Sequence, residues 1–440
     1  MIALLLLALG LALADEPAPA PEPVAEPAPA PAPEPAAAAA PAPAPKAPPA
    51  PPWQRKHWGW GGVPALNYNS DEGFGFGLLA SIYRYDGTTN PYKLSFTFLF
   101  FMTTRSVHSH RIDMDWVDVG GTPLRLQARI QLKATNTANF CGYGWDVSCD
   151  PAVAEQAADT QGLTGTARED FIRHYYYARW LRPNGYLLAR YRISTGKPKI
   201  ELFAGWRGEE FLSRFWKDPG PYPGSLYDTT VGAEDGFLSV VQVGAMMDKR
   251  DNEPAPRRGY WNEVSLRAAP KFLGSAWQYV GFNGTFRFYA PLVPKNGILT
   301  LASRTVLDGF WGDANVHEFS QVGGSQVYNF GGGAEAGRGI RLRRFIGRAK
   351  AMEQLELRYA FVRFRVVKAN TEITALAFLD SLVAAAEWND LGPAFAHPAF
   401  GEGIGFRFAF NENFIIRADV GFSAVENWSP GIYIDVDHLF

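Results

Sequence analysis

The chain has 440 residues, of which 47% are hydrophobic and 14% are aromatic, yet its mean hydropathy is only -0.14. Beyond residue 14 there is no run of 18 or more apolar residues, which excludes a protein that crosses a membrane with helices. The net charge of -2 favours neither sign, so the composition gives no indication of nucleic-acid binding.

The first 52 residues differ in composition from the rest. Residues 1–14, MIALLLLALGLALA, form an apolar run that ends in a small-x-small cleavage sequence and is too short to span a bilayer, which predicts a signal peptide. Residues 15–52 contain 16 of the 33 prolines and consist otherwise mainly of alanine and glutamate. Such a segment cannot bury a core, so we expect a disordered linker, rich in polyproline II, that acts as a spacer in the periplasm. Binding of a periplasmic or cell-wall partner is the alternative.

From residue 53 to residue 440 the apolar residues recur with a period of two. In the segment 92–103, for example, Phe96 and Phe98 fall on one face, whereas Ser95 and Thr97 fall on the other. This alternation is typical of strands with one apolar face, and segments of about ten residues are long enough for a tilted strand to cross a bilayer. We therefore predict one all-β domain, a transmembrane antiparallel β-barrel of about 16 strands. The strands are expected near residues 74–84, 92–104, 107–117, 123–135, 168–181, 184–195, 198–209, 236–248, 258–270, 276–290, 297–308, 352–364, 371–388, 401–410, 413–424 and 430–440.

An even number of strands places both ends of the barrel domain on the same side, which we expect to be the periplasm. Connections that follow odd-numbered strands are then external, and they include the long segments 210–235 and 309–350. By the same numbering the segment 136–167 follows an even-numbered strand, so it is either an inserted periplasmic segment or a sign that the count is wrong by one. Cys141 and Cys149 lie in this segment, where they form either a disulfide in an oxidising compartment or two free thiols.

Polar residues in the segment 107–117 raise the question of a catalytic or metal site. His108 and His110 have the spacing of metal ligands, and Asp113 and Asp115 follow them. A small cation site or a protease-like Asp/His pair is one interpretation, but four polar residues on the lumen face of a barrel strand are the simpler one. The sequence has no nucleophile elbow, phosphate-binding loop or zinc motif. We therefore expect no enzymatic activity, no metal and no cofactor.

The segment 331–345, GGGAEAGRGIRLRRF, is dense in glycine and holds Arg338 between two glycines. Glycine permits positive φ and a close approach to other backbone, so this loop can fold back into the barrel with its guanidinium pointing inward. An inward arginine requires a carboxylate, and Asp380 is available on a later predicted strand. There Phe378 and Asp380 share one face, whereas Leu379 lies on the other, wholly apolar face. The alternative is a solvated surface loop with scattered basic residues.

The last predicted strand, 430–440, ends on an aromatic residue. Its apolar residues are expected to share one face: Ile432, Ile434, Val436 and Phe440. A final amphipathic strand of this form is the kind of signal that outer-membrane assembly machinery reads, so that machinery is an expected partner. His438 departs from the pattern, because it stands where a large apolar residue is expected.

Four motifs occur in the same order as in one known family. They are Asp248-Lys249-Arg250-Asp251 with Gly259 in a central turn, Gly337-Arg338-Gly339-Ile340 in the glycine-rich loop, Glu356-Leu357-Arg358 on the next strand, and Phe378-Leu379-Asp380 on the strand after it. Together they resemble the bacterial surface antigen family, the outer-membrane assembly-factor superfamily of Bam- and Tam-type barrels and two-partner secretion transporters. Of the family's loop motif, Val/Ile-Arg-Gly-Phe/Tyr, only Arg338 and Gly339 are matched. The segment 139–144, NFCGYG, also resembles an element of barrel-only members.

The resemblance implies an outer-membrane protein of a Gram-negative bacterium that takes part in the insertion or translocation of proteins or lipids. It also implies that the acid of Phe-x-Asp, Asp380, meets the loop arginine inside the barrel. The expected partners are outer-membrane lipids and either unfolded client proteins or a separate periplasmic docking protein. Family members carry polypeptide-transport-associated repeats before the barrel, and here the segment 15–52 stands in that place. A passive or plugged pore for small solutes is the alternative function, and an outer-membrane hydrolase is a more distant one.

Overall fold

The structure is a computed structural model, and it describes residues 56–89, 91–213, 220–253, 255–293, 298–366, 369–410, 414–436 and 438–440. The expected signal peptide and linker lie outside these residues. Among the described residues, no helix has the length and apolar character needed to cross a membrane.

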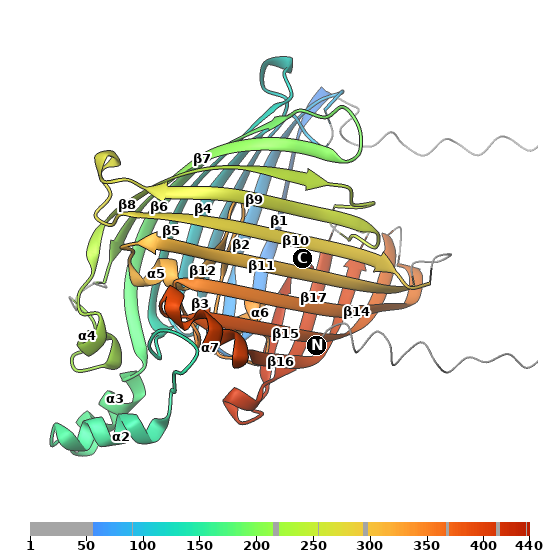
Figure 1. The fold of residues 1–440 in the computed structure, drawn as a ribbon. Coiled ribbons are helices and arrows are strands. Elements are labelled where there is room, and N and C mark those ends of the chain that lie inside the picture. The colour runs from blue at the N-terminus through green and yellow to red at the C-terminus, as the bar shows by residue number, and fades with distance from the viewer. Residues whose placement is uncertain are drawn as a thin grey trace, which may run out of the picture. The chain divides into compact units, whose positions relative to one another are not determined.

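Sixteen antiparallel strands close into a barrel, which confirms the predicted fold (Figure 1). The barrel strands are β1 Lys56–Asn69, β2 Gly73–Asp86, β3 Leu94–Thr103, β4 His108–Trp116, β5 Leu124–Asn139, β6 Tyr177–Arg192, β7 Lys199–Leu212, β8 Asp235–Asp248, β9 Gly259–Ala269, β10 Tyr279–Pro291, β11 Leu299–Gly312, β14 Ala349–Val366, β15 Ala369–Ala385, β16 Ala399–Phe410, β17 Phe414–Phe422 and β18 Gly431–Val436. Two short strands, β12 Gln321–Gly323 and β13 Val327–Asn329, form a separate hairpin.

Alternation along each strand separates an apolar outer face from a largely polar lumen. On β15, Asp380 is fully buried in the interior, whereas its neighbour Leu379 is 39% exposed on the outside. On β3, Ser95 is buried and Phe100 is half exposed. Because lipid cannot satisfy backbone N–H and C=O groups, only a closed ladder of this kind lets strands with one apolar face cross a bilayer.

The predicted strand list contains two errors that cancel in the total. β1 was not predicted, because three glycines and Pro64 interrupt its apolar alternation. Conversely, no separate strand covers residues 168–181: helix α3 Gly165–His174 occupies the first part, and the rest begins the single long strand β6. The run of tyrosines at residues 175–177, which follows α3 directly, has strand-like composition and explains why the predicted strand began too early.

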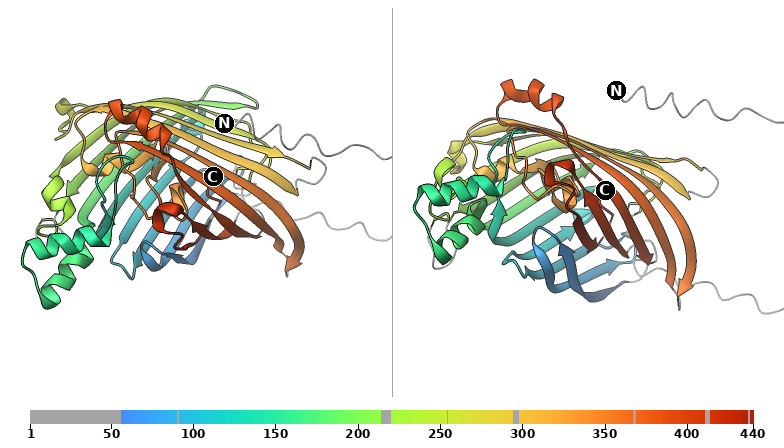
Figure 2. Two further views of the ribbon diagram at one scale, coloured as in Figure 1. Left: turned by 60° about the horizontal axis from the view of Figure 1, so that its bottom comes forward. Right: turned by 90° about the horizontal axis from the view of Figure 1, so that it is seen from below.

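The missed β1 changes the side to which the segment 136–167 belongs. β5 is the fifth strand, so the connection after it lies at the same end as the connections after β7 and β11. Of the two alternatives, a count in error by one is therefore the correct one, because the segment follows an odd-numbered strand once β1 is included. This connection carries α2 Pro151–Thr160 and α3, which project from one end of the barrel (Figures 1 and 2).

Short helices occupy several other connections. They are α4 Leu226–Thr230, α5 Val316–Phe319, α6 Gly333–Ala336 and α7 Leu391–Ala396, with single 3-10 turns at η2 Val119–Gly121, η3 Lys271–Leu273, η4 Trp388–Asp390 and η5 Ala424–Glu426.

The lumen of the barrel is filled by the connection between β11 and β14. Apolar side chains of this loop, including Phe330 and Ile340, are fully buried against Val306, Met352 and Leu382 of the wall. A second and larger cluster packs the start of the same connection, including Val316 and Phe319, against wall residues such as Trp180 and Phe310. The burial of these side chains fixes the loop in place.

The barrel closes through a seam between β1 and β18 that is much shorter than the other strand pairings. Only Tyr68 and Asn69 of β1 pair in register with β18, opposite Ile434 and Tyr433, whereas 14 residues of β1 pair with β2. Ser70 extends the seam by two bonds: its N–H donates to the carbonyl of Ile432 at 3.1 Å, and its hydroxyl accepts from the N–H of Ile432 at 3.2 Å. Within the described part of the chain, residues 58–67 of β1 therefore have a ladder on one side only.

Candidate functional site

The glycine-rich part of the lumen loop, residues 331–345, forms a finger that touches the wall with its backbone. Gly339 has a φ of +90°, and a Cβ there would lie 2.4 Å from the backbone N of Phe422. The facing wall is also made of glycines. A Cβ on Gly421 of β17 would lie 2.7 Å from the carbonyl carbon of Arg338, and a Cβ on Gly401 of β16 would lie 2.0 Å from the carbonyl oxygen of Arg338. Glycine is needed on both sides for this approach.

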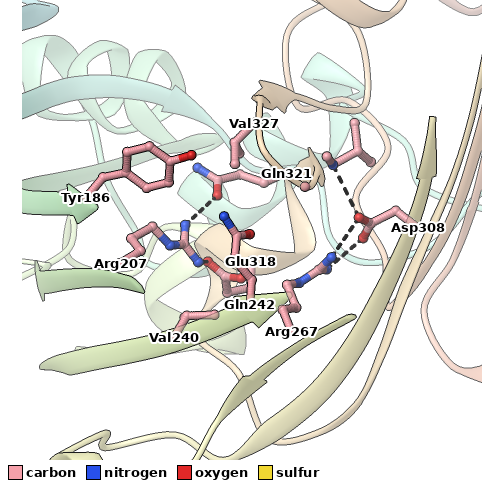
Figure 3. A pocket seen from close by; sticks show the side chains of 12 residues that line it. Tyr186, Arg207, Val240, Gln242, Arg267, Asp308, Glu318, Gln321 and Val327 are labelled. Atoms are coloured by element: carbon pink, nitrogen blue, oxygen red, sulfur yellow. Dashed lines mark hydrogen bonds and ion pairs between the residues drawn. The ribbon is translucent and has the colours of Figure 1, made fainter. Parts of the chain in front are cut away.

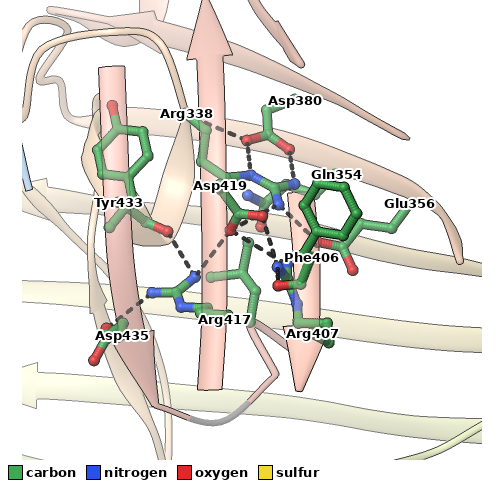
Figure 4. A network of polar contacts seen from close by, with 12 residues as sticks. Arg338, Gln354, Glu356, Asp380, Phe406, Arg407, Arg417, Asp419, Tyr433 and Asp435 are labelled. Carbon is green, nitrogen blue, oxygen red and sulfur yellow. Dashed lines mark hydrogen bonds and ion pairs between the residues drawn. The ribbon is translucent and has the colours of Figure 1, made fainter. Parts of the chain in front are cut away.

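The finger places Arg338 against Asp380, as the alternation of β15 and the family resemblance predict (Figure 4). The guanidinium donates from Nε and Nη2 to the two carboxylate oxygens of Asp380 at 2.9 and 2.8 Å, and the backbone N–H of Arg338 adds a third bond at 2.9 Å. Nη1 donates to Glu356 Oε1 at 2.7 Å, and the ring of Phe378 lies 3.6 Å below the guanidinium carbon. All three charged side chains are fully buried.

Burial alone lowers the pKa of Arg338, but the neighbouring carboxylates of Asp380 and Glu356 outweigh it, so the net shift of its pKa is upward. The guanidinium therefore stays charged in the lumen. The planar fork matches the carboxylate of Asp380 with two parallel bonds, a geometry that an ammonium group cannot reproduce.

A second layer of arginines surrounds this pair. Arg407 donates to Asp419 at 2.6 Å, and Arg358 donates to Glu356 at 2.7 Å. Arg417 of β17 pairs with Asp435 of β18 at 3.0 Å. The network therefore joins the finger to β14, β16, β17 and β18, so the position of the finger is coupled to the strand that forms one side of the seam (Figure 4).

Sequence reasoning places Glu356, Arg358 and Phe378 at this site, and the structure brings them together there. It missed Arg407 and Asp419. A signal was available, since β16 carries glycine at residues 401, 403 and 405, the alternate positions that face the lumen. Alternate glycines on one strand face indicate that another backbone packs against it.

The last residues of the chain do not lie where the sequence predicts. Ile432 and Ile434 face outward and are 38% and 42% exposed, but Phe440 is 5% exposed and lies in the lumen. Its carbonyl accepts from Arg358 Nη2 at 3.0 Å, and its ring packs with Tyr289 on the opposite wall. The prediction that Phe440 shares the outer face is wrong because β18 ends at Val436 and the period of two does not continue beyond it.

The predicted central turn connects β8 and β9, at the end of the barrel opposite α2 and α3. Asp248 accepts from Nε and Nη2 of Arg250 at 3.0 and 2.9 Å, and Asp251 accepts from the backbone N–H of Arg257 at 3.0 Å. Gly259 has a φ of +105°, and a Cβ there would lie 2.2 Å from a carbonyl oxygen of the turn. These residues fix the turn and lie apart from the finger.

The cysteines and the histidines also have defined places. Cys141 and Cys149 are bridged, in the connection that carries α2 and α3. His110 stacks on Phe100 of the outer face with ring centroids 4.4 Å apart. Asp113 and Asp115 lie on the opposite, inner face of β4, where they pair with arginines.

The expectation that all four polar residues of β4 face the lumen is therefore wrong, because residues 108 and 110 differ from 113 and 115 by an odd number of positions. Among the described residues, no group of three or more His, Cys, Asp or Glu side chains is arranged to hold a metal ion.

Comparison with known proteins agrees with this geometry. A model of the Omp85 superfamily domain matches residues 125–429. The barrel is similar to that of BamA from Haemophilus ducreyi lacking POTRA domains 1-3, with a TM-score of 0.53 and 11% identity over 87% of this chain and 70% of that chain. It is also similar to CdiB from Escherichia coli, with a TM-score of 0.51 and 10% identity over 86% of this chain and 62% of that chain. No curated protein matches the chain.

At these identities the solved structures share the fold, whereas the family model covers well over half of the sequence. The chain is thus an outer-membrane β-barrel that belongs to the Omp85 superfamily.

Proposed function

We propose that this protein promotes the insertion of polypeptides into the outer membrane, or their translocation across it, and that the seam between β1 and β18 is the working edge. The observation that carries the proposal is the shortness of this seam, which holds two register pairs. Everywhere else in the described barrel, neighbouring strands pair along at least six residues.

An incompletely paired strand in a membrane is a template for another strand. Each unsatisfied backbone group in lipid costs several kcal/mol, so a client strand that adds to residues 58–67 of β1 is strongly favoured. β1 is suited to exchange partners, because Gly59, Gly61 and Gly62 weaken its packing and Pro64 removes a backbone donor. In this proposal the end with α2 and α3 faces the exterior, and both ends of the barrel domain face the periplasm.

The filled lumen supports this function over a passive pore. Between the loop and the wall, a cavity of about 40 Å³ is crossed by the pairs Arg207–Glu318 at 2.6 Å and Arg267–Asp308 at 2.8 Å (Figure 3). A cavity of this volume holds about two or three water molecules. Arg207–Glu318 joins β7 to the loop, and Asp308 of β11 also accepts from the backbone N–H of Gly323 in the loop at 3.2 Å. These contacts hold the loop in the path that a solute would take.

A hydrolase is also less well supported than an assembly role. The Asp/His pair that sequence analysis considered cannot form on β4, because Asp113 faces the lumen and His110 faces outward against Phe100.

A covalent lock across the seam tests the proposal. Tyr68 and Ile434 are directly opposite each other in an antiparallel pair, a separation that suits a disulfide, so Tyr68→Cys/Ile434→Cys should cross-link on oxidation. In liposomes, the reduced variant should accelerate the insertion of an unfolded outer-membrane barrel with little conductance. The oxidised variant should insert clients no faster than empty liposomes do.

Wild-type protein carried through the same oxidation and reduction controls for the Cys141–Cys149 bridge. Unchanged acceleration in the locked variant, or steady conductance without acceleration in the wild type, contradicts the proposal and favours a pore.

A further inference from the structure

Residues 341–344 of the lumen loop contact both hairpins that border the seam. On the β1 side, the backbone N–H of Leu342 donates to Asp71 Oδ1 at 3.1 Å. Asp71 lies in the turn between β1 and β2. Arg105 stabilises this turn, because its Nη1 donates to the carbonyls of Ser70 and Asp71 at 3.0 and 2.8 Å.

On the β18 side, the same segment binds Glu426 of η5, in the turn between β17 and β18. Glu426 accepts from the backbone N–H of Arg341 at 3.3 Å and pairs with its Nε at 3.1 Å. Arg344 Nε lies 3.8 Å from Glu426 Oε1, the oxygen that accepts from the Arg341 N–H. Just before this segment, the N–H of Gly339 donates to the hydroxyl of Tyr433 on β18 at 3.1 Å.

The segment is itself firmly held. Leu342 and Arg344 are 7% and 8% exposed, and Asn139 of β5 donates to the carbonyl of Leu342 at 3.0 Å. Arg338, four residues before Leu342, is fixed by Asp380. The two sides of the seam are therefore tied through a third element that cannot move freely with either side.

We propose that residues 341–344 act as a clasp that holds the β1–β18 seam shut, so that the clasp must be released before the seam opens to a client. Residues 341–344 make one contact with Asp71 and three with Glu426, and Gly339 adds one with Tyr433, whereas the seam itself has two register pairs. Removing them should shift the opening equilibrium strongly. The inference deepens the proposed function and rests on it for its biological purpose, but the mechanical claim can be tested alone.

Hydrogen exchange of the protein in lipid nanodiscs measures opening directly. Asp71→Ala and Glu426→Gln should each lower the protection factors of the seam amides, in residues 68–70 and 432–434, by about tenfold. Asp71→Ala removes the acceptor of the Leu342 N–H, and Glu426→Gln removes the charge that pairs with Arg341 and Arg344. Protection in β7 and β8 should not change. Glu387→Gln is the matched control, because Glu387 pairs with Arg348 of the same loop at 3.0 Å but lies away from the seam.

Combining either variant with the oxidised Tyr68→Cys/Ile434→Cys lock should restore protection at the seam, which shows that the variant folds. Unchanged protection at the seam, or an equal loss throughout the barrel, overturns the clasp. Faster seam exchange without any change in client insertion leaves the clasp intact and contradicts the proposed function instead. Altered client insertion without altered seam exchange contradicts the clasp and leaves the proposed function intact.

The clasp should also loosen as the pH rises. Burial raises the pKa of Asp71 to about 7, and nearby Glu72 and Glu426 raise it further, while the Leu342 amide and Arg105 oppose the shift. Arg343 and Tyr433 also face this carboxylate. A raised folded pKa means that the stability from protonated Asp71 is present at low pH and is lost as the pH rises through about 7.

Seam protection factors, which correct for the intrinsic rate, should therefore be lower at pH 8.5 than at pH 5.5. Asp71→Asn, which mimics the protonated side chain, should remove this dependence and keep the higher protection. An equally steep dependence in Asp71→Asn would assign the pH effect to another group.

Discussion

Arg338→Ala and Asp380→Ala should each destabilise the folded barrel by about 3–5 kcal/mol, because each leaves the other charge buried without its partner. The pair is fully buried and joined by three bonds, two from the guanidinium and one from the backbone. Unfolding in urea, followed by tryptophan fluorescence and by heat-modifiable migration on gels, measures the loss.

The double variant should be much less destabilised than the sum of the two single variants, since it removes both buried charges together. Arg338→Lys should recover little of the stability, because an ammonium cannot make the parallel bonds to Asp380. Arg168→Ala is the control: Arg168 also pairs with an aspartate, at 2.9 Å, but the two side chains are 34% and 63% exposed, so its loss should leave the free energy of unfolding nearly unchanged. Additive single and double effects would show that the pair does not hold the finger.

Gly421→Ala should displace the finger, at a cost of about 1–3 kcal/mol or more. The added Cβ would lie 2.7 Å from both the carbonyl carbon of Arg338 and the N of Gly339, and these are backbone atoms that cannot rotate away. Relief requires the finger to leave the wall, which also breaks the contact of Arg338 with Asp380. We expect a lower unfolding midpoint together with faster tryptic cleavage after the arginines of residues 338–344.

Gly61→Ala provides the matched control, since Gly61 is also a strand glycine but has nothing within 4 Å of the position of a Cβ. It should be neutral or slightly stabilising, because alanine lowers the entropy of the unfolded chain. If both variants behave alike, the tight contact between finger and wall is not what holds the loop in the lumen.

The sequence by itself determined the barrel and indicated Asp380 as a partner of its central arginine. Alternation with a period of two is a local property, and only a closed set of such strands satisfies the backbone in lipid, so the fold follows from short segments. The face of Asp380 followed from the same parity, and glycines around Arg338 indicated a loop that approaches a wall. β1 was not predicted, because its three glycines and Pro64 leave too little alternation of apolar and polar residues to distinguish a strand from a linker.

Only the tertiary structure decided how the barrel is closed and what crosses its seam. The length of the β1–β18 pairing depends on where β18 ends against β1, and the inward course of Phe440 depends on a wall more than 70 residues away in sequence. The ties of residues 341–344 to Asp71 and Glu426 join parts of the chain that no local pattern relates. Periodicity specifies which face of a strand meets lipid, whereas contacts between distant segments depend on the closed shape that all the strands produce together.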